Sequence, residues 1–108
     1  MNRSVIAQPK AKIQTTENAV WWSENRSLDE AIRWLIVIES AINGLAENAE
    51  RHPLARESES FDIQVRQLNV GISGKRTHRI LFSIHDDRVV VYAVRNLAQR
   101  DITPDDLK

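Results

Sequence analysis

Residues 77–96, THRILFSIHDDRVVVYAVRN, decide the fold of this chain. Their two apolar runs, residues 79–84 and 89–94, are rich in β-branched and aromatic side chains, which are typical of β-strands. The four residues between the runs are polar, and two successive aspartates favour a tight turn. The stretch therefore predicts two antiparallel strands joined as a hairpin.

The second strand of this hairpin is apolar at every position from Val89 to Val94, so both of its faces would be buried. A strand of that kind belongs in the middle of a sheet or under a helix layer. Arg79 begins the first run and Arg95 follows the second, and these two ends are neighbours in an antiparallel pair. We therefore expect the hairpin at the centre of the sheet, with two cations close together at one end.

The N-terminal segment predicts a short strand followed by a helix. Residues 5–7 are apolar and stop before Pro9, which suits the first turn of a helix because no amide hydrogen bond is needed there. We expect the strand to lie at a sheet edge and the helix to cover residues 10–25. The apolar side chains on one helical stripe are Ile13, Val20 and Trp21.

A second helix is predicted from residue 28 to about residue 48. Ser27 and Glu30 form a capping-box pattern, in which each side chain satisfies a backbone amide of the first turn. The expected inward stripe consists of Leu28, Ala31, Ile32, Leu35, Ile38, Ile42 and Leu45. Because Trp34, Ile36 and Val37 lie off this stripe, the helix is expected to contact the first helix or another chain on a second side.

The remaining segments complete a single domain over residues 1–108. Residues 47–60 are polar and predict a linker. Residues 61–70 predict a strand with a bulge near residues 66–67, and residues 71–76 predict a turn. The order is β-α-α-β-β-β with a short C-terminal tail. This is an α+β fold, in which a helical hairpin packs on one face of a small, twisted, mostly antiparallel sheet and the other face is free to bind.

The composition, 42% hydrophobic and 28% charged, is that of an ordinary globular domain. Without cysteine there is no disulfide and no thiolate metal site, and His52, His78 and His85 lack the spacing of metal ligands. No apolar run reaches the ~20 residues of a membrane span, and the N-terminus does not read as a signal peptide. We expect a cytoplasmic protein with no metal, no cofactor and no membrane partner.

Charge is unevenly distributed, although it sums to zero. Residues 61–100 carry seven Lys or Arg against three acidic residues, whereas residues 1–60 carry seven against nine. A basic sheet surface suits nucleic acid or an acidic protein, and the simpler interpretation is a solvated surface. The candidate basic cluster consists of Arg66, Lys75, Arg76, Arg79 and Arg95.

Arg66, Arg79 and Arg95 lie within predicted strands, where apolar residues would be expected. An arginine in such a position needs a carboxylate, a phosphate or solvent. One interpretation is a structural salt bridge, with Asp62 or Asp86 as the partner. The other is a cluster that faces a bound anion, either a phosphate or an acidic peptide.

The chain resembles the RelE/ParE toxins of bacterial type II toxin–antitoxin systems. The segments that carry the resemblance follow one another along most of the chain. They are AVWWSENRS (residues 19–27), Glu30-Ala31 through Trp34, Ile42 through LAEN (residues 45–48), HPLA (residues 52–55) together with Glu57, VRQL (65–68), HRILFSI (78–84), the strand VVVYAVR (89–95) and DITPDDL (101–107). No single motif is specific, but their order and spacing together are. The family's fold agrees with the one predicted above.

The resemblance implies a small toxin that inhibits growth and is neutralised by an antitoxin, whose C-terminal segment would contact the helices and the basic sheet face. RelE-like members cut messenger RNA on the ribosome, and ParE-like members inhibit DNA gyrase. In RelE-like enzymes, arginines on the strands contact the scissile phosphate. Arg79 and Arg95 match those positions, and Arg66 lies nearby on the preceding strand.

RelE-like nucleases often place a tyrosine or histidine after the last strand and tend to be strongly basic. Residues 96–108 contain neither, and this chain is neutral. We therefore predict a ParE-like toxin, of the kind that stabilises plasmids, which binds DNA gyrase and is not an enzyme. The alternatives are a ribosome-dependent mRNA endoribonuclease using Arg79 and Arg95, and an inactive relative that only binds antitoxin. Either a homo-oligomer or a toxin–antitoxin hetero-oligomer is expected.

Overall fold

The computed structural model describes residues 2–107. The helices and strands are β1 (Ser4–Ala7), α1 (Pro9–Asn25), α2 (Leu28–Asn48), β2 (Arg66–Val70), β3 (His78–Ile84) and β4 (Arg88–Asn96). Three short 3₁₀ helices lie at Ala49–Arg51, Arg56–Ser60 and Pro104–Leu107. The predicted α+β class and the order β-α-α-β-β-β are confirmed, and both long helices begin and end within one residue of their predicted bounds.

The four strands form one sheet in the order β1-β4-β3-β2, so the predicted hairpin occupies its centre. β3 pairs with β4 and with β2 antiparallel, whereas β1 runs parallel to β4 at one edge. Arg79 and Arg95 are direct partners across β3 and β4, as expected for the two ends of an antiparallel hairpin.

The predicted bulge near residues 66–67 is wrong, because β2 begins only at Arg66. The residues before it are bound to a neighbouring loop: the Val65 amide donates to Ser58 Oγ, and the Val65 carbonyl accepts from the Ala55 amide. The register shift lies instead in the central hairpin. Leu81 pairs with Ala93 and Phe82 pairs with Val91, which leaves Tyr92 as an extra residue in β4.

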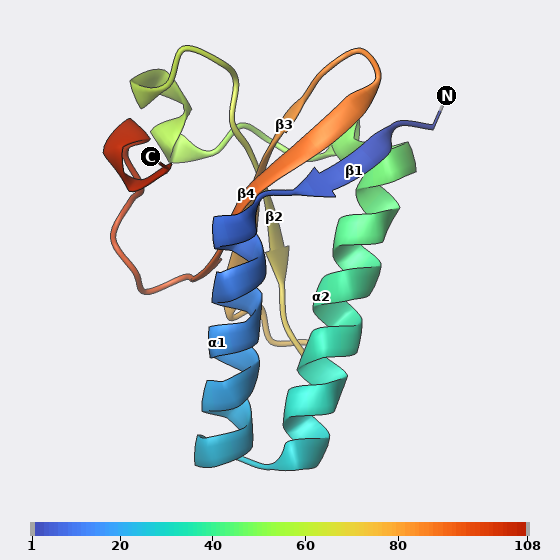
Figure 1. Cartoon of the computed structure of the whole chain (residues 1–108), viewed down its shortest axis with the longest axis vertical. Helices are drawn as coiled ribbons and strands as arrows, with labels where there is room; N and C mark the ends of the chain where they lie inside the picture. Colours follow the sequence, from blue (N-terminus) through green and yellow to red (C-terminus); the bar gives the residue numbers. More distant parts are fainter. Residues whose placement is uncertain (1, 108) are drawn as a thin grey trace.

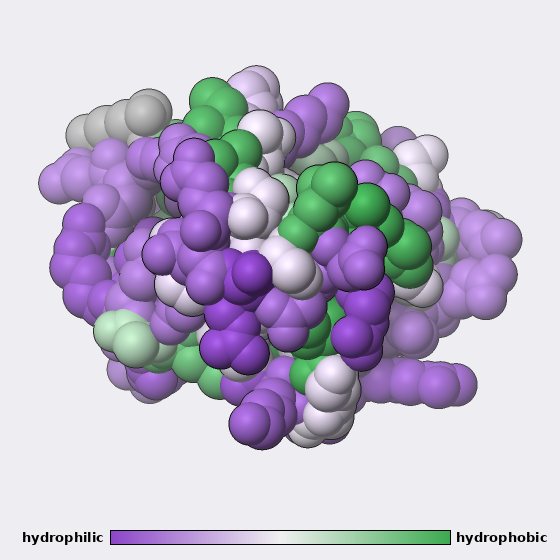
Figure 2. Space-filling view, turned by 90° about the horizontal axis from the view of Figure 1, so that it is seen from below, coloured by the Kyte–Doolittle hydropathy of each residue, from purple (hydrophilic) through white to green (hydrophobic). Residues whose placement is uncertain are grey.

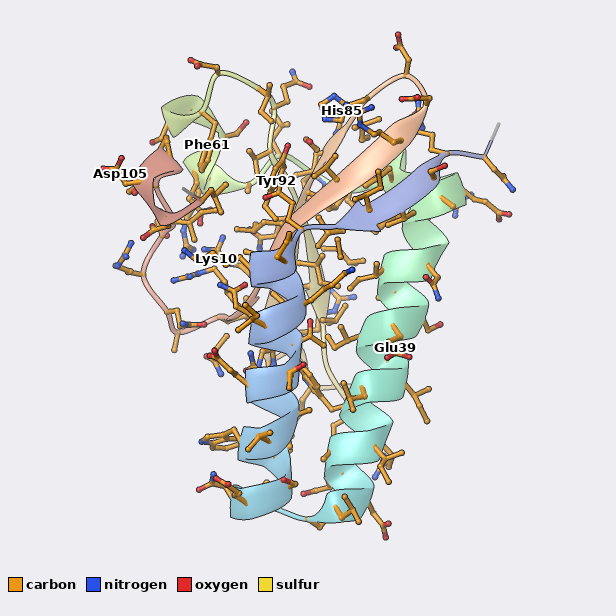
Figure 3. The ribbon with its side chains drawn as sticks, viewed as in Figure 1. Lys10, Glu39, Phe61, His85, Tyr92 and Asp105 are labelled. Atoms are coloured by element: carbon orange, nitrogen blue, oxygen red, sulfur yellow. The ribbon has the colours of Figure 1, made fainter. Side chains whose placement is uncertain are left out.

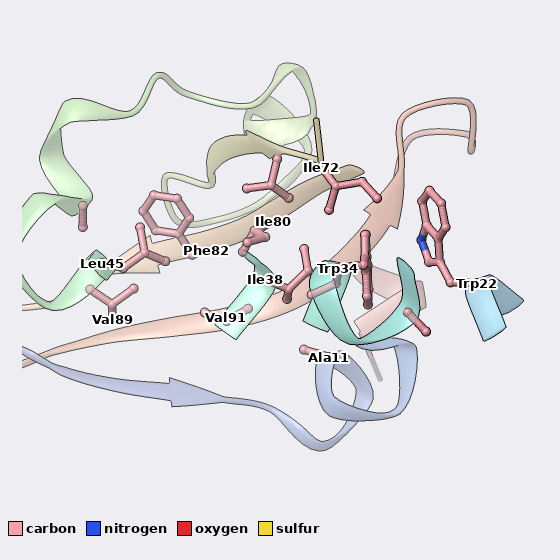
Figure 4. Close-up of a cluster of buried hydrophobic side chains, with 14 residues drawn as sticks. Ala11, Trp22, Trp34, Ile38, Leu45, Ile72, Ile80, Phe82, Val89 and Val91 are labelled. Atoms are coloured by element: carbon pink, nitrogen blue, oxygen red, sulfur yellow. The ribbon is translucent and has the colours of Figure 1, made fainter. Parts of the chain in front are cut away.

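The helical hairpin covers one face of the sheet (Figure 1). The core between these layers combines side chains of α2, β3 and β4 (Figure 4). Its largest fully buried members are Trp34, Ile38, Leu45, Ile80, Phe82, Val89, Val91 and Val94. This layering follows from the amphipathic pattern of α2 and from the β-branched strands beneath it.

The faces that the two helices bury differ from those predicted. In α1, Ile13, Val20 and Trp21 are each about half exposed, and the buried residues are Ala11 and Trp22. Ala11 and Trp22 are eleven residues apart, which is three helical turns, so they share one face. The small alanine allows close approach to the sheet while the indole fills the space at the other end of the helix.

In α2, Trp34 is fully buried although it lies off the predicted stripe. Three members of the solvent-facing side, Leu28, Ile32 and Ile36, are 66%, 47% and 61% exposed. The helix is turned so that the indole, its largest side chain, enters the core, because burial of an aromatic ring removes the most apolar area from water.

The second face of the sheet is not free, contrary to the prediction. Residues 53–65 and the tail after β4 lie over it and form a second apolar cluster. Its members are Ala55, Val65, Leu81, Ala93 and Ile102, with Phe61 and Leu107 packed beside them. Because β3 and β4 carry apolar side chains on both faces, the chain supplies its own second layer. Among residues 2–107, no helix combines the length and apolar character needed to cross a lipid bilayer.

Candidate functional site

Arg79 lies on the second face of the sheet and is fully buried. Its guanidinium donates to both carboxylate oxygens of Glu57, with Nη1 2.6 Å from Oε1, and also to Gln67 Oε1 at 3.1 Å. Glu57 comes from the segment predicted as a linker and is itself 3% exposed. The salt-bridge interpretation of Arg79 therefore matches the geometry, but the partner is Glu57 and neither Asp62 nor Asp86.

The Glu57 carboxylate also joins the tail to the sheet, because its Oε2 accepts the Ile102 amide at 3.0 Å. Burial raises the pKa of Glu57, but the hydrogen bonds from Arg79 and Ile102 outweigh it and hold that pKa below the usual value. The group is thus a charged carboxylate with three donors. Nothing local in the sequence separates Glu57 from its exposed neighbour Glu59.

Arg95 lies directly beside Arg79, but no carboxylate within residues 2–107 is paired with it. Its Nη2 donates to the Arg100 carbonyl at 2.9 Å, and its Nε is buried without a hydrogen bond in the described chain. Burial lowers the pKa of Arg95, and the neighbouring charges of Arg79 and Arg100 lower it further. Two guanidinium charges, those of Arg79 and Arg95, therefore lie beside a single buried carboxylate.

The tail after β4 closes over this pair. Arg100 donates to both oxygens of Asp106 at 2.7 and 2.9 Å, and the Thr103 amide donates to the same carboxylate. These bonds hold the pKa of Asp106 well below its usual range. Lys10 of α1 donates to the Asp106 carbonyl, and Ile102 is buried beneath the tail. The two arginines are thereby separated from solvent.

The other three predicted cations lie elsewhere. Lys75 and Arg76 are exposed in the turn between β2 and β3, at the same end of the sheet as Arg79. Arg66 lies three positions further along the ladder, opposite Phe82, where its Nη1 donates to the His52 carbonyl at 2.6 Å. The structure thus brings Arg79 and Arg95 together and does not gather all five cations into one contiguous surface.

The helical hairpin presents an apolar surface to solvent. Its exposed members are Ile13, Val20, Trp21, Leu28, Ile32 and Ile36. A groove of about 270 Å³ runs between the two helices, with Ala19 and Val20 on one wall and Ile32 and Leu35 on the other. Figure 2 views the molecule from the end where the helices join and shows apolar side chains reaching the surface among polar ones.

His78 joins the helices to the sheet through a buried hydrogen-bond network. Its Nε2 is 2.9 Å from Asn18 Oδ1 of α1, and its Nδ1 is 2.8 Å from Thr77 Oγ1. Nδ1 also accepts from Trp34 Nε1 of α2 at 3.4 Å. Burial lowers the pKa of His78 to about 4, so the imidazole is neutral and donates through Nε2. A hollow of about 440 Å³ lies beside it, lined also by Trp21 and Trp22.

Within the part of the chain that the structure describes, no group of three His, Cys, Asp or Glu side chains is placed to hold a metal ion.

The fold has a counterpart among solved structures. A chain in the structure of the chromosomal ParDE TA system from P. aeruginosa superimposes with a TM-score of 0.70, covering 87% of this chain and 95% of that one. The two share their fold. Their sequences are 15% identical over the match. No protein-family model and no curated protein matches the sequence.

Proposed function

We propose that this chain is the toxin of a type II toxin–antitoxin pair, of the ParE-like kind, and that it acts by binding a protein. The observation that carries the proposal is the fold shared with a chain of the ParDE system over nearly the whole of both chains. DNA gyrase is the proposed target. A cognate antitoxin, encoded next to the toxin, is the proposed neutralising partner.

The state of the arginines supports protein binding over RNA cleavage. Arg79 is buried and bound to Glu57, and Arg95 is covered by the tail, so neither is placed to hold a scissile phosphate. A nuclease at this position would first have to displace the tail and break a buried ion pair, which costs roughly 3–5 kcal/mol when one partner is removed. The nuclease therefore stands as the alternative that the experiment must exclude.

The apolar surface of the helical hairpin supports an antitoxin-binding role. Exposed apolar side chains that line one groove, as Val20, Leu28 and Ile32 do, commonly mark a protein interface. The groove between α1 and α2 suits an amphipathic segment that lays alternate apolar side chains between Val20 and Ile32. The proposed antitoxin segment is therefore amphipathic.

Brief induction of the toxin in cells separates the candidates. Growth arrest with damaged plasmid DNA and intact transcripts is expected for gyrase inhibition. Transcripts cut at codon-related positions would instead establish the nuclease. Normal growth at confirmed expression would leave only the inactive relative that binds antitoxin.

Antitoxin binding is tested with the product of the adjacent gene. The double variant Leu28→Ser/Ile32→Ser is expected to lose at least tenfold in affinity and to remain toxic, because both side chains are exposed. Leu54→Ser is the matched control, since Leu54 is 50% exposed but lies off the helical hairpin. Equal affinity of the double variant and the control would show that the antitoxin binds elsewhere.

A further inference from the structure

A second cleft lies where β3 extends past its neighbour. β2 begins at Arg66 opposite Phe82, so Ser83 and Ile84 have no strand partner on that side in the part of the chain that the structure describes. The chain before Arg66 turns away to the loop around Ala55. The resulting cleft of about 400 Å³ is lined by Glu50, Ile63, Gln64, Arg66, Ser83, Ile84 and His85. It is separate from the covered Arg79–Arg95 pair and from the helical hairpin.

Two polar side chains that line this cleft, Ser83 and His85, are linked to each other, and Ser83 is also linked to Tyr92, which does not line it. Ser83 Oγ lies 2.9 Å from His85 Nε2 and 2.8 Å from the Tyr92 hydroxyl, while Ser83 is only 1% exposed. His85 is held at its backbone too: its amide donates to the Arg88 carbonyl and its carbonyl accepts from Arg3 Nε. Tyr92 lies on β4, whereas His85 directly follows β3 at the start of the turn that joins the two strands (Figure 3).

The direction of these hydrogen bonds determines whether His85 presents a donor or an acceptor to the cleft. If Tyr92 donates to Ser83 and Ser83 donates to His85 Nε2, then Nε2 is the accepting ring nitrogen and Nδ1 is the one that carries a hydrogen. Nδ1 has no hydrogen bond within residues 2–107. His85 then presents an N–H donor in a side chain whose position is already fixed, so little entropy is lost when a ligand accepts from it.

Arg66 supplies the charge. Its Nη1 is anchored on the His52 carbonyl at 2.6 Å, and the rest of the guanidinium has no hydrogen bond or ion pair in the described chain. The acid of the same cleft, Glu50, is already paired with Arg3 at 2.6 Å. The acids of the adjoining turn, residues 86–87, are exposed and do not line the cleft. Among the described residues, Arg66 is therefore the cation of this cleft whose charge no carboxylate compensates.

We propose that this cleft binds a phosphate group, with Arg66 as its principal anchor and His85 as a second donor. A planar guanidinium matches the oxygens of phosphate through parallel N–H donors, and charge-assisted bonds of this kind are stronger than neutral ones. The Tyr92–Ser83–His85 chain orients the second donor. The proposal does not depend on the toxin assignment, because it uses neither the helical hairpin nor Arg79 and Arg95.

The test is a titration of the isotopically labelled full chain with inorganic phosphate at constant pH and ionic strength, followed by amide NMR shifts. We expect saturable shifts that are largest around Arg66 and residues 83–85. Arg66→Met is expected to weaken binding at least tenfold, and His85→Phe severalfold. Arg88→Met is the matched control and keeps the wild-type affinity, because Arg88 is exposed and does not line the cleft.

If Arg66→Met unfolds, a second variant that keeps the hydrogen bond from Arg66 to His52 still tests the proposal. Ile63→Asp places a negative charge on the rim at a position that is 41% exposed, and it is expected to abolish phosphate binding. Ile36→Asp, at 61% exposure on α2, is its control. The proposal is overturned if phosphate shifts do not saturate, or if cleft variants and controls bind alike.

Competition with a short single-stranded RNA identifies the source of the phosphate. RNA that displaces inorganic phosphate in the wild type, but binds Ile63→Asp at least tenfold more weakly, assigns the cleft to a nucleic-acid backbone. RNA that leaves the phosphate shifts unchanged assigns it to free phosphate or a small phosphate ester. Both results retain Arg66 as the anchor.

Discussion

The buried pair of Arg79 and Glu57 fixes how the second layer meets the sheet, because Glu57 also binds the Ile102 amide. Removing one charge of such a pair leaves the other buried and uncompensated. Glu57→Gln is therefore expected to lower the free energy of unfolding by roughly 3–5 kcal/mol. In the double variant Glu57→Gln/Arg79→Met, more than half of that loss is expected to return.

Urea unfolding of the two single variants and the double variant measures this coupling. Glu59→Gln serves as the control, since Glu59 is exposed and lies two residues further along the same 3₁₀ helix. Additive effects of the two substitutions would contradict a shared role. The same geometry makes an Arg79→Ala variant a poor test of toxicity, because loss of activity would accompany loss of stability.

His78 gives the fold a pH dependence. Its pKa of about 4 lies below the ordinary 6.5, so the unfolded chain takes up the proton first as pH falls. The stability that His78 contributes is full above pH 6.5 and is lost progressively down to about pH 4, by up to about 3 kcal/mol. Burial, followed by the charges of Arg51 and Arg66, also lowers the pKa of His52, so His52 contributes a further loss of stability as pH falls.

Urea unfolding across pH 7 to 4.5 in wild type and His78→Gln checks this assignment. The variant is expected to be less stable at pH 7 and to show a shallower fall toward pH 4.5. His52→Gln is the companion variant that separates the second histidine. A wild-type slope retained in His78→Gln would assign the pH dependence to other groups.

At the scale of elements, the tail after β4 works as a cover for the sheet. Ile102 is 2% exposed and packs with Leu81 and Ala93 of the central strands. Ile102→Ala is expected to cost roughly 2–4 kcal/mol of stability, because it opens a cavity over the arginine pair. Leu97→Ala, at a position that is 37% exposed, should cost less than about 1 kcal/mol.

Chemical denaturation of both variants provides the comparison, and hydrogen exchange at the Ile102 amide adds a local measurement. That amide donates to Glu57, so its protection should fall in Ile102→Ala before the central strands open. Equal stability of the two variants would mean that the tail contributes little to the fold.

At the scale of the molecule, the apolar surface of the helical hairpin should make the isolated chain self-associate. Ile32 and Ile36 are one helical turn apart and 47% and 61% exposed. Ile32→Ser/Ile36→Ser is expected to lower the weight-average mass in sedimentation at high concentration, without loss of stability. A wild-type chain that stays monomeric at millimolar concentration would contradict this.

The sequence predicted those features that local signals determine. The capping serine of α2, Ser27, accepts from the Glu30 amide at 3.1 Å as expected, and the polar turn between β3 and β4 encodes their hairpin. The helix faces were not predictable in this way, because tertiary contacts selected Trp22 and Trp34 over neighbouring apolar residues.

Long-range pairing also set the candidate sites. Glu57 reaches Arg79 across twenty-two residues of chain, from a polar segment whose several acids look alike in sequence. The adjacency of Arg79 and Arg95 was predictable because hairpin register is local. The cover that buries them was not, since the described tail packs on the sheet through two widely spaced apolar side chains, Ile102 and Leu107, among polar and charged residues.

The register shift in β4 means that Tyr92 is surplus to the ladder. Val91 and Ala93 already face consecutive residues of β3, so excising Tyr92 would leave a regular strand with every later pairing, including Arg79 with Arg95, unaltered. Backbone architecture alone gives no reason to accommodate this residue. Without it the molecule would lose a single phenol oxygen, which lies within hydrogen-bond distance of a serine on the neighbouring strand.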